Sequence, residues 1–193
     1  YTCVHFHPEY LEASDRKQIS RYKIKVGIKE PILIEATAIR QAALLGMVEF
    51  SETSSWIHFR NVDGLILSCR RYLEEYENFG RHLQSNGGVK TSFPKGLVEA
   101  VDKAKVFSSE TADGNDQVLV ELITGKLRVT GRGVHGWFRE SKKLQYDGEP
   151  IKFLISPSLI TEIVKKNNEI EVSKDKLRAE NGPWTYAAAL YVV

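Results

Sequence analysis

The sequence predicts an α+β protein made of tandem repeats, in which helices pack on small antiparallel sheets. The first observation behind this prediction is a strand that leads directly into a helix over 149–166, where alternating apolar residues give way to an apolar stripe at helical spacing. The second is that the tripeptide Glu-Pro-Ile opening this stretch at position 149 also occurs at position 30, 119 residues earlier. A long-period repeat of this kind indicates two copies of one domain.

The later strand–helix unit is the better defined of the two copies. Ile151, Phe153 and Ile155 form the apolar face of a half-buried strand. Ser156 suits the N-cap, and Pro157 suits the first helical position because its missing N–H costs nothing there. The helix carries its apolar residues at helical spacing: Leu159, Ile160, Ile163 and Val164.

The earlier unit follows the same plan. A short strand over 32–34 precedes Thr37, the expected N-cap, and a helical pattern that continues to Met47. Three segments after each helix also correspond: 48–50 with 170–172, 56–59 with 176–179, and 65–67 with 185–187. The similarity therefore extends over the whole region from the strand to the end of each copy.

The remaining elements complete an antiparallel pattern. Strands are expected over 2–6, 10–13 and 17–28, and a meander over 48–50, 56–60 and 65–70 has its turn at Asp63-Gly64. A polar connector over 71–90 separates the copies. A strand over 89–93 leads into a helix opened by Pro94, a loop follows over 108–116, and strands are expected over 117–123, 126–130 and 134–143.

The complete repeat is therefore β-α-β-β-β-β-α-β-β-β, with two helices on two sheets. The first copy lacks the leading strand and helix, and its residues 1–13 align with 117–129. We expect the first repeat to be truncated at its N-terminus. The predicted domains are an incomplete first domain over 1–80, a connector over 81–88 and a complete second domain over 89–193.

Composition excludes few functions. The chain has 193 residues and a formal net charge of +2, which gives no global case for nucleic-acid binding, so that case depends on where the charges lie. Cys3 and Cys69 form no disulfide framework and favour a reducing compartment, so a cytoplasmic location is expected. No apolar run is long enough to predict a membrane span.

The sequence shows no set of residues for catalysis or for holding a cofactor or metal. Residues 131–136 match G-x-G-x-x-G, but a strand pattern follows where the dinucleotide motif needs a helix, so a glycine-rich hairpin is expected. His5 and His7 would share one strand face, and two imidazoles alone do not make a zinc site. A binding protein without enzymatic activity is therefore predicted, with an enzyme on an α+β scaffold as the weakest hypothesis.

Three short motifs carry a family resemblance. Residues 11–19 are similar to the strand-turn-strand motif Ala-Thr-Asp-Gly-His-Arg-Leu of bacterial beta sliding clamps, the processivity rings of replicative DNA polymerases. Residues 63–68 and 76–79 resemble the end of that family's middle domain, and 97–104 resemble the opening helix of its third domain. The resemblance implies a DNA-clamp fold covering most of the middle domain and all of the third.

The chain departs from the family pattern at three places, and one of them is Glu77, which replaces the Pro of the family's Phe-Pro-Asp-Tyr run. Arg16-Lys17-Gln18 stands where the family has Gly-His-Arg, and the last five residues, 189–193, replace the family's Met-Pro-Met-Arg-Leu tail. These departures suit a divergent clamp, for instance from a phage. They imply that its preferred partner peptide differs from the usual bacterial one.

The resemblance also implies function. A sliding clamp encircles duplex DNA without reading its sequence, self-associates into a homodimeric ring when full length, and binds polymerase and clamp-loader peptides in a hydrophobic pocket between its middle and third domains. A clamp-fold regulatory or decoy protein that binds replication partners without encircling DNA is the alternative. The expected DNA-contacting residues are Arg40, Lys103, Lys105, Lys165 and Lys166. The expected peptide-binding residues are Ser14, Arg16, Lys17, Ile19, Arg81, His82, Leu159, Lys176, Leu190 and Tyr191.

Without the resemblance, both sets of residues have a second interpretation. Cations on helices more often form a solvated outer face, and only the resemblance turns them toward DNA phosphates. Leu159 and Leu190 could equally be plain core residues.

Overall fold

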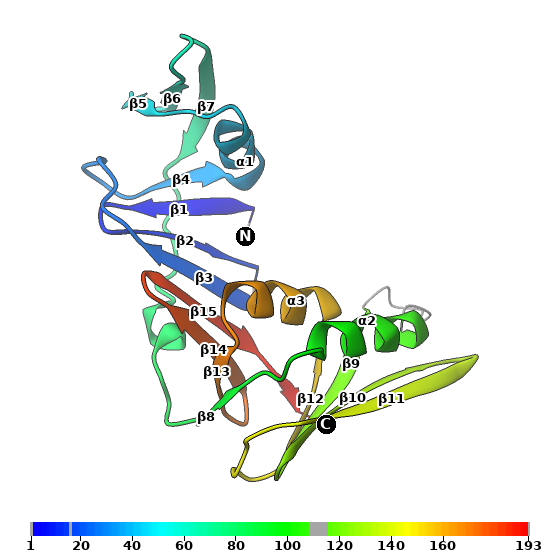
Figure 1. Ribbon diagram of the computed structural model, residues 1–193. Coiled ribbons are helices and arrows are strands. Elements are labelled where there is room, and N and C mark those ends of the chain that lie inside the picture. The colour runs from blue at the N-terminus through cyan, green and yellow to red at the C-terminus, as the bar shows by residue number, and fades with distance from the viewer. Residues whose placement is uncertain (1, 16, 109–115, 193) are drawn as a thin grey trace. The chain divides into compact units, whose positions relative to one another are not determined.

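The computed structural model describes residues 2–15, 17–108 and 116–192. It divides into two compact units, unit 1 (Tyr1–His82) and unit 2 (Leu83–Val193), each with its own sheets and core (Figure 1). No helix in the described part of the chain is long and apolar enough to cross a membrane.

Unit 1 is an antiparallel sheet carrying one helix. Its strands lie in the order β5-β6-β7-β4-β1-β2-β3. The elements are β1 (Cys3–His7), β2 (Tyr10–Ser14), β3 (Gln18–Lys23), β4 (Ile32–Glu35), α1 (Ala36–Leu44), β5 (Glu49–Glu52), β6 (Trp56–Arg60) and β7 (Ile66–Tyr72). A 3-10 turn, η1 (Gly80–Leu83), follows.

Unit 2 has two antiparallel sheets and two helices. One sheet has the order β15-β14-β13-β8 and the other β11-β10-β9-β12-β16. Its elements are β8 (Val89–Ser92), α2 (Leu97–Ser108), β9 (Val118–Ile123), β10 (Lys126–Gly133), β11 (Gly136–Lys143), β12 (Ile151–Ile155), α3 (Pro157–Lys166), β13 (Glu169–Val172), β14 (Lys176–Asn181), β15 (Trp184–Ala189) and β16 (Tyr191–Val192).

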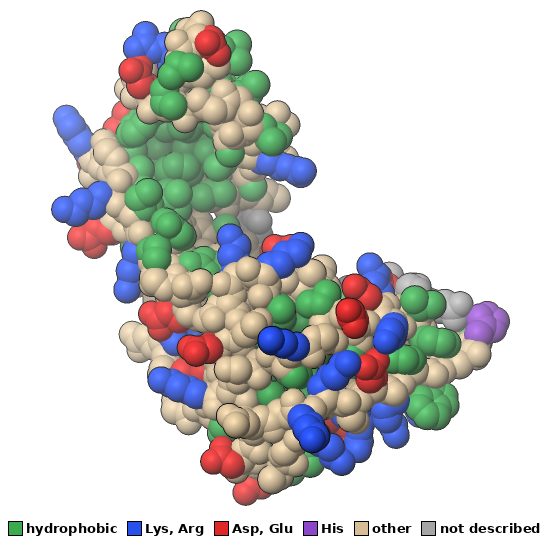
Figure 2. All heavy atoms as spheres, viewed as in Figure 1, with side chains coloured by type: hydrophobic (Ala, Val, Ile, Leu, Met, Phe, Trp, Pro, Cys, Tyr) green, Lys and Arg blue, Asp and Glu red, His purple; other side chains and the backbone are tan. Residues whose placement is uncertain are grey.

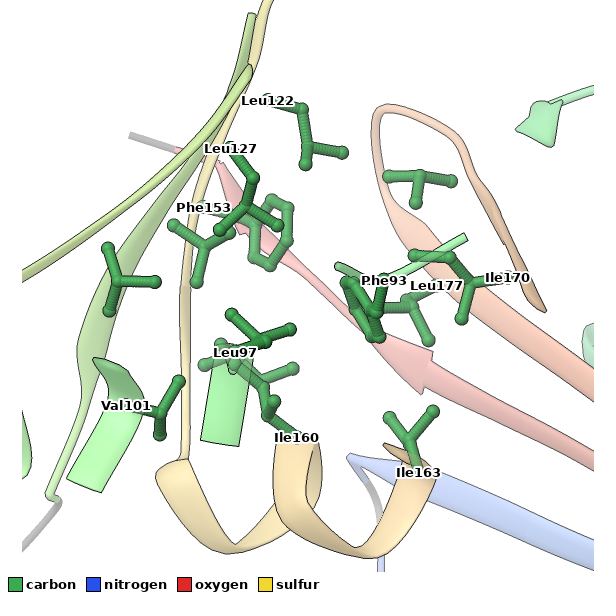
Figure 3. Packing of buried hydrophobic residues seen from close by; sticks show 14 of the residues in the cluster. Phe93, Leu97, Val101, Leu122, Leu127, Phe153, Ile160, Ile163, Ile170 and Leu177 are labelled. Carbon is green, nitrogen blue, oxygen red and sulfur yellow. The ribbon is translucent and has the colours of Figure 1, made fainter. Parts of the chain in front are cut away.

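The core of unit 2 lies where both helices meet both sheets. Leu97 and Val101 of α2 and Ile160 of α3 point toward Phe153 of β12, and each of these side chains is at most 1% exposed (Figure 3). The core of unit 1 is smaller, and its buried members come from its sheet and adjoining loop: Phe6, Ile28, Ile32, Ile34, Ile57 and Cys69.

Gly131 allows α2 to lie directly on β10. A Cβ atom built on this glycine would overlap the carbonyl oxygen of Ala104 in α2. Gly131 is the first glycine of the G-x-G-x-x-G match, and the segment forms the β10–β11 hairpin, in which Gly133 pairs with Gly136. The expected glycine-rich hairpin is therefore confirmed, and its glycine serves helix–sheet packing.

The predicted repeat appears in the strand pairing. In unit 1, β4 pairs with β7 through Leu33 and Tyr72, and in unit 2, β12 pairs with β16 through Phe153 and Val192. Both residues of the second pair stand 120 positions after those of the first, since 153 minus 33 and 192 minus 72 give the same number. The predicted fold class, tandem copies of helices on antiparallel sheets, is confirmed.

Several predicted boundaries were wrong. Glu35, not Thr37, caps α1, because the chain turns into the helix directly after the last strand residue, and the helix ends at Leu44 rather than Met47. Helix α2 begins at Leu97, three residues after Pro94. The third strand covers only 18–23 of the expected 17–28. Most of the predicted loop over 108–116 lies outside the described residues.

The predicted start of α3 is correct in position. Ser156 is the N-cap and Pro157 opens the helix. The Ser156 side chain makes no capping hydrogen bond, because its Oγ lies 2.9 Å from Ser158 Oγ instead.

Candidate nucleic-acid interface and partner surface

All five basic residues predicted to contact DNA are exposed on helices. Arg40 lies on α1, Lys103 and Lys105 lie on α2, and Lys165 and Lys166 lie in the last turn of α3. Helices α2 and α3 bury most of their apolar residues in the core of unit 2, so their charged residues face outward, whereas only Ala42 of α1 is buried. In unit 2, α2 packs against α3, which brings four of these cations onto neighbouring helices (Figure 1).

Acidic residues partly offset these charges. The Lys103 ammonium lies 3.4 Å from Glu140, which also accepts from Lys142 at 2.6 Å, and these contacts hold the pKa of Glu140 below its usual range. Lys165 lies 3.3 Å from Glu162 one turn earlier. Acidic side chains are interspersed with basic ones over unit 2 (Figure 2). Within the described chain no ion pair involves Arg40, Lys105 or Lys166, so these carry the least compensated charge.

The predicted partner-binding residues of unit 1 share one sheet face. Ser14 of β2 pairs with Ile19 of β3, and both side chains are 8% exposed. Lys17 lies in the turn between them and is exposed, with its backbone N–H donating to Asp15 Oδ1. Arg16 lies outside the described residues. This half of the predicted site therefore combines two nearly buried side chains with an exposed cation.

Arg81 and His82 lie in η1 and are exposed. The Arg81 Nε donates to His82 Nε2 at 3.2 Å, and the His82 backbone N–H donates to the Phe79 carbonyl at 2.9 Å. These hydrogen bonds define the conformation of η1, from which both side chains extend.

The predicted partner-binding residues of unit 2 differ in accessibility. Leu190 is 7% exposed and belongs to the core cluster, so it is a core residue. Leu159 is half-buried at the start of α3, and Tyr191 on β16 is 48% exposed. Lys176 Nζ donates to the Gln84 carbonyl at 2.6 Å. Among the predicted residues of unit 2, Leu159 and Tyr191 are therefore the apolar ones that a ligand can reach.

Sequence reasoning missed a polar and aromatic network in unit 1. Glu12 is 2% exposed, and its Oε2 accepts from Arg21 Nε at 2.6 Å. The Arg21 guanidinium also lies 4.1 Å from the centre of the Tyr10 ring. Tyr76 stacks on His5 at 4.1 Å between ring centroids. The alternation of Tyr10, Glu12 and Ser14 with apolar neighbours was the available signal.

Burial changes the pKa values of His5 and Tyr76 in this network. Burial, and then the neighbouring His7 and Arg21, lowers the pKa of His5 to about 4. Burial and the negative charge of Glu12 raise the pKa of Tyr76. His5 is therefore neutral and Tyr76 protonated near neutral pH.

A second buried carboxylate lies in unit 2. Burial by itself would raise the pKa of Glu171, but hydrogen bonds from Ser85 Oγ (2.7 Å) and the Gly88 N–H (3.0 Å) and the charge of Arg178 hold it below its usual range. Arg178 Nε also donates to the Leu83 carbonyl at 2.7 Å. The start of unit 2 is thereby tied to β13 and β14.

A groove of about 1570 Å³ in unit 2 contains none of the predicted site residues. Its lining includes Phe93, Tyr146 and Ile170, together with cations such as Lys90 and anions such as Glu169. In the described part of the chain no group of three or more His, Cys, Asp or Glu residues could hold a metal ion. Neither feature indicates a catalytic centre.

Comparison with solved structures identifies the architecture. A Bartonella birtlesii sliding clamp (DNA polymerase III subunit beta) bound to griselimycin matches with a TM-score of 0.82 over 100% of this chain and 58% of its own, at 14% identity. The chain has the sliding-clamp fold. The beta chain of DNA polymerase III from Streptococcus pneumoniae matches with a TM-score of 0.81, at 17% identity over 98% of this chain and 56% of its own.

A third sliding clamp shows the same likeness. The DNA polymerase III beta subunit of Thermotoga maritima matches with a TM-score of 0.78 and 17% identity over 100% of this chain. The chain spans 57% of the length of that clamp. No family model matches the sequence, and no curated protein matches it.

Proposed function

We propose that this chain is part of a DNA polymerase processivity factor, a sliding clamp that encircles duplex DNA and has no catalytic activity of its own. The observation that carries the proposal is the sliding-clamp fold, which matches clamps from three bacteria along 98–100% of the chain. The internal repeat supports the proposal, because a closed ring is built from copies of one structural unit.

The helices are the proposed DNA surface. Arg40, Lys105 and Lys166 are exposed and, in the described chain, without ion-pair partners, so they are available to phosphates. Contacts of this kind do not depend on base sequence and weaken as salt rises. A sliding ring needs many such weak contacts and no base readout.

Partner tethering is proposed for the residues that the resemblance marks. Leu159 and Tyr191 offer accessible apolar surface on unit 2, and Ile19 lies near the exposed cation Lys17 on unit 1. An apolar centre with a charged rim is a common arrangement in peptide-binding surfaces. Polymerase and clamp-loader peptides are the proposed ligands.

Self-association into a ring is proposed for the edge strand β11. This strand of eight residues lies at the end of its sheet and is hydrogen-bonded only to β10 within the described chain. Trp137 is 59% exposed on it, and Val134, just before it, is 82% exposed. Long unprotected edges with exposed apolar residues pair readily with another strand.

The alternative, a clamp-fold protein that binds replication partners without encircling DNA, is favoured by one observation. Helix α2 carries Glu99 and Asp102 beside Lys103 and Lys105, so its formal charge is balanced. A weakly basic helix layer would hold DNA less firmly.

Primer extension by the cognate polymerase tests the proposal. The protein containing this chain should lengthen the products made in a single binding event, and Tyr191→Ala should remove most of that gain because it deletes exposed apolar surface. Lys126→Ala, an exposed change on another hairpin, is the control. Unchanged product length with the parent protein contradicts the processivity role.

A further inference from the structure

The segment between β7 and η1 lies against the polar face of the first three strands of unit 1. Over 73–79 it has no helix or strand, and most of its side chains, including Leu73, Glu75 and Glu77, are exposed. Phe79 is 9% exposed and Tyr76 is half-buried, so these two aromatic side chains face the unit. Tyr76 and Phe79 therefore attach the segment 73–79 to unit 1.

Tyr76 is held by the network described above. Its ring stacks on His5 with centroids 4.1 Å apart and planes 22° apart. His5 also meets the edge of Tyr10 at 5.9 Å, and Tyr10 lies under the Arg21 guanidinium. Because Arg21 pairs with buried Glu12, the residues under Tyr76 form a connected set of contacts.

Phe79 links Tyr76 to η1. It meets Tyr76 edge-on at 5.5 Å, and its carbonyl accepts the His82 N–H at 2.9 Å. The Gly80 N–H donates to Asn78 Oδ1 at 2.9 Å, which fixes the bend between them. Arg81 and His82 therefore start from a backbone whose position depends on Tyr76.

The same sheet face carries the other proposed partner residues of unit 1. Glu12 and Ser14 are two positions apart on β2, and their partners Arg21 and Ile19 are two positions apart on β3. Side chains two positions apart on a strand share a face. The residues under Tyr76 thus continue into the patch formed by Ser14 and Ile19.

We propose that Tyr76 is a positioning residue for partner binding, which holds η1 so that Arg81 and His82 complete the surface begun by Ser14, Lys17 and Ile19. The ligand that fits is a short peptide with a carboxylate for the exposed cations Lys17 and Arg81. This inference rests on the proposed partner-binding function and assigns a role to a residue that does not itself touch the peptide.

The test uses griselimycin, the ligand bound by the Bartonella birtlesii clamp, as the probe. Its affinity is measured by calorimetry for the parent chain and for Tyr76→Ala, Tyr76→Phe and Glu77→Ala. The last is the matched control, because Glu77 is exposed on the same segment. Amide hydrogen exchange of His82 is followed in the same four proteins.

Tyr76→Ala is expected to weaken binding about tenfold and to speed His82 exchange about tenfold, because the stacking contact that fixes η1 is lost. Tyr76→Phe keeps the ring, so it should restore both values to within about twofold of the parent, as should Glu77→Ala.

Two results overturn the inference, and they are distinguishable. Equal His82 exchange in Tyr76→Ala and Glu77→Ala shows that Tyr76 does not hold η1. Faster exchange with unchanged griselimycin affinity shows that η1 takes no part in binding. Absence of griselimycin binding by the parent chain instead contradicts the proposed partner site itself, and the role of Tyr76 falls with it.

Discussion

Units 1 and 2 share the order of four strands, a helix and three strands, yet they bury their sheets to different degrees. In unit 2, β13 pairs with β8 and its Ile170, Glu171 and Val172 are buried. In unit 1, the corresponding strand β5 has exposed side chains throughout and pairs only with β6 in the described chain. The burial of β13 comes with β8 and α2, and the described part of unit 1 contains no such pair.

The uncovered surface of unit 1 is apolar. Figure 2 shows a continuous hydrophobic area on this unit. Leu44 of α1 is 72% exposed and Ile66 of β7 is 62% exposed. We therefore expect unit 1 to be less stable than unit 2, because apolar burial is the main favourable term in folding. Four predictions test this comparison.

Gly131→Ala should have the largest effect and should act on unit 2 alone. The new methyl group would overlap the Ala104 carbonyl, so α2 must move off β10, and we expect the free energy of unfolding to fall by about 4 kcal/mol. Gly27→Ala in unit 1 is the control, since its new Cβ would lie at an ordinary 3.6 Å from the Phe50 ring. Denaturant unfolding with residue-resolved hydrogen exchange separates the two units. Equal losses in both variants would show that α2 is not packed as described.

Removing the arginine of each buried ion pair should cost more in unit 1. In Arg21→Met, Glu12, which is 2% exposed, loses the ion pair with Arg21, so unit 1 should lose about 3 kcal/mol. In Arg178→Met, Glu171 keeps the donors Ser85 and Gly88, and unit 2 should lose about 1 kcal/mol. Thermal unfolding of both variants measures the difference. A larger loss for Arg178→Met would reverse the order of importance assigned to the two pairs.

Mild acid should destabilise unit 1 before unit 2. The pKa of His5 falls from 6.5 to about 4 on folding, so between these values the unfolded chain binds the proton and the folded chain does not. Stability is full above pH 6.5 and should be about 2 kcal/mol lower at pH 5. The pKa of Glu171 is lowered on folding, so unit 2 loses that contribution only as pH falls through the folded pKa, below 4.5. Unit-resolved exchange at pH 7.5 and pH 5 checks this. His5→Gln should flatten the response of unit 1, and an unchanged response in that variant would assign it to another group.

The smallest effect concerns DNA. Lys166→Ala should reduce the slope of log affinity against log salt by about 0.9 without changing sequence preference, because one phosphate contact is lost. Lys174→Ala, an exposed lysine in the turn between β13 and β14, should leave the slope unchanged. Fluorescence anisotropy with duplexes of two unrelated sequences measures both variants. Altered sequence preference would reveal base readout, which a sliding ring does not use.

The sequence predicted most of the fold because its signals were local. Alternation placed Phe153 inward, and the serine–proline pair located the start of α3. The repeat was visible because each copy opens with the same tripeptide. The cap of α1 was missed because Thr37 resembles a capping residue, whereas the chain turns helical directly after β4.

The candidate site was harder to predict, because it depends on contacts distant in sequence. The stacking of Tyr76 on His5 joins residues about seventy positions apart, and the Glu171–Ser85 hydrogen bond spans still more. No local pattern predicts such pairs. Leu159 and Leu190 had the same apolar signal, and only the structure separates the half-buried residue from the core one.

Retention on DNA of defined topology tests the central claim most directly. The full-length protein containing this chain is loaded onto nicked circular plasmid by its clamp loader and then separated from free protein by gel filtration at high salt, which removes phosphate contacts. The sliding-clamp account predicts that the protein remains with circular DNA and is lost once the plasmid is linearised. Equal loss from circular and linear DNA would contradict encirclement and favour the partner-binding alternative.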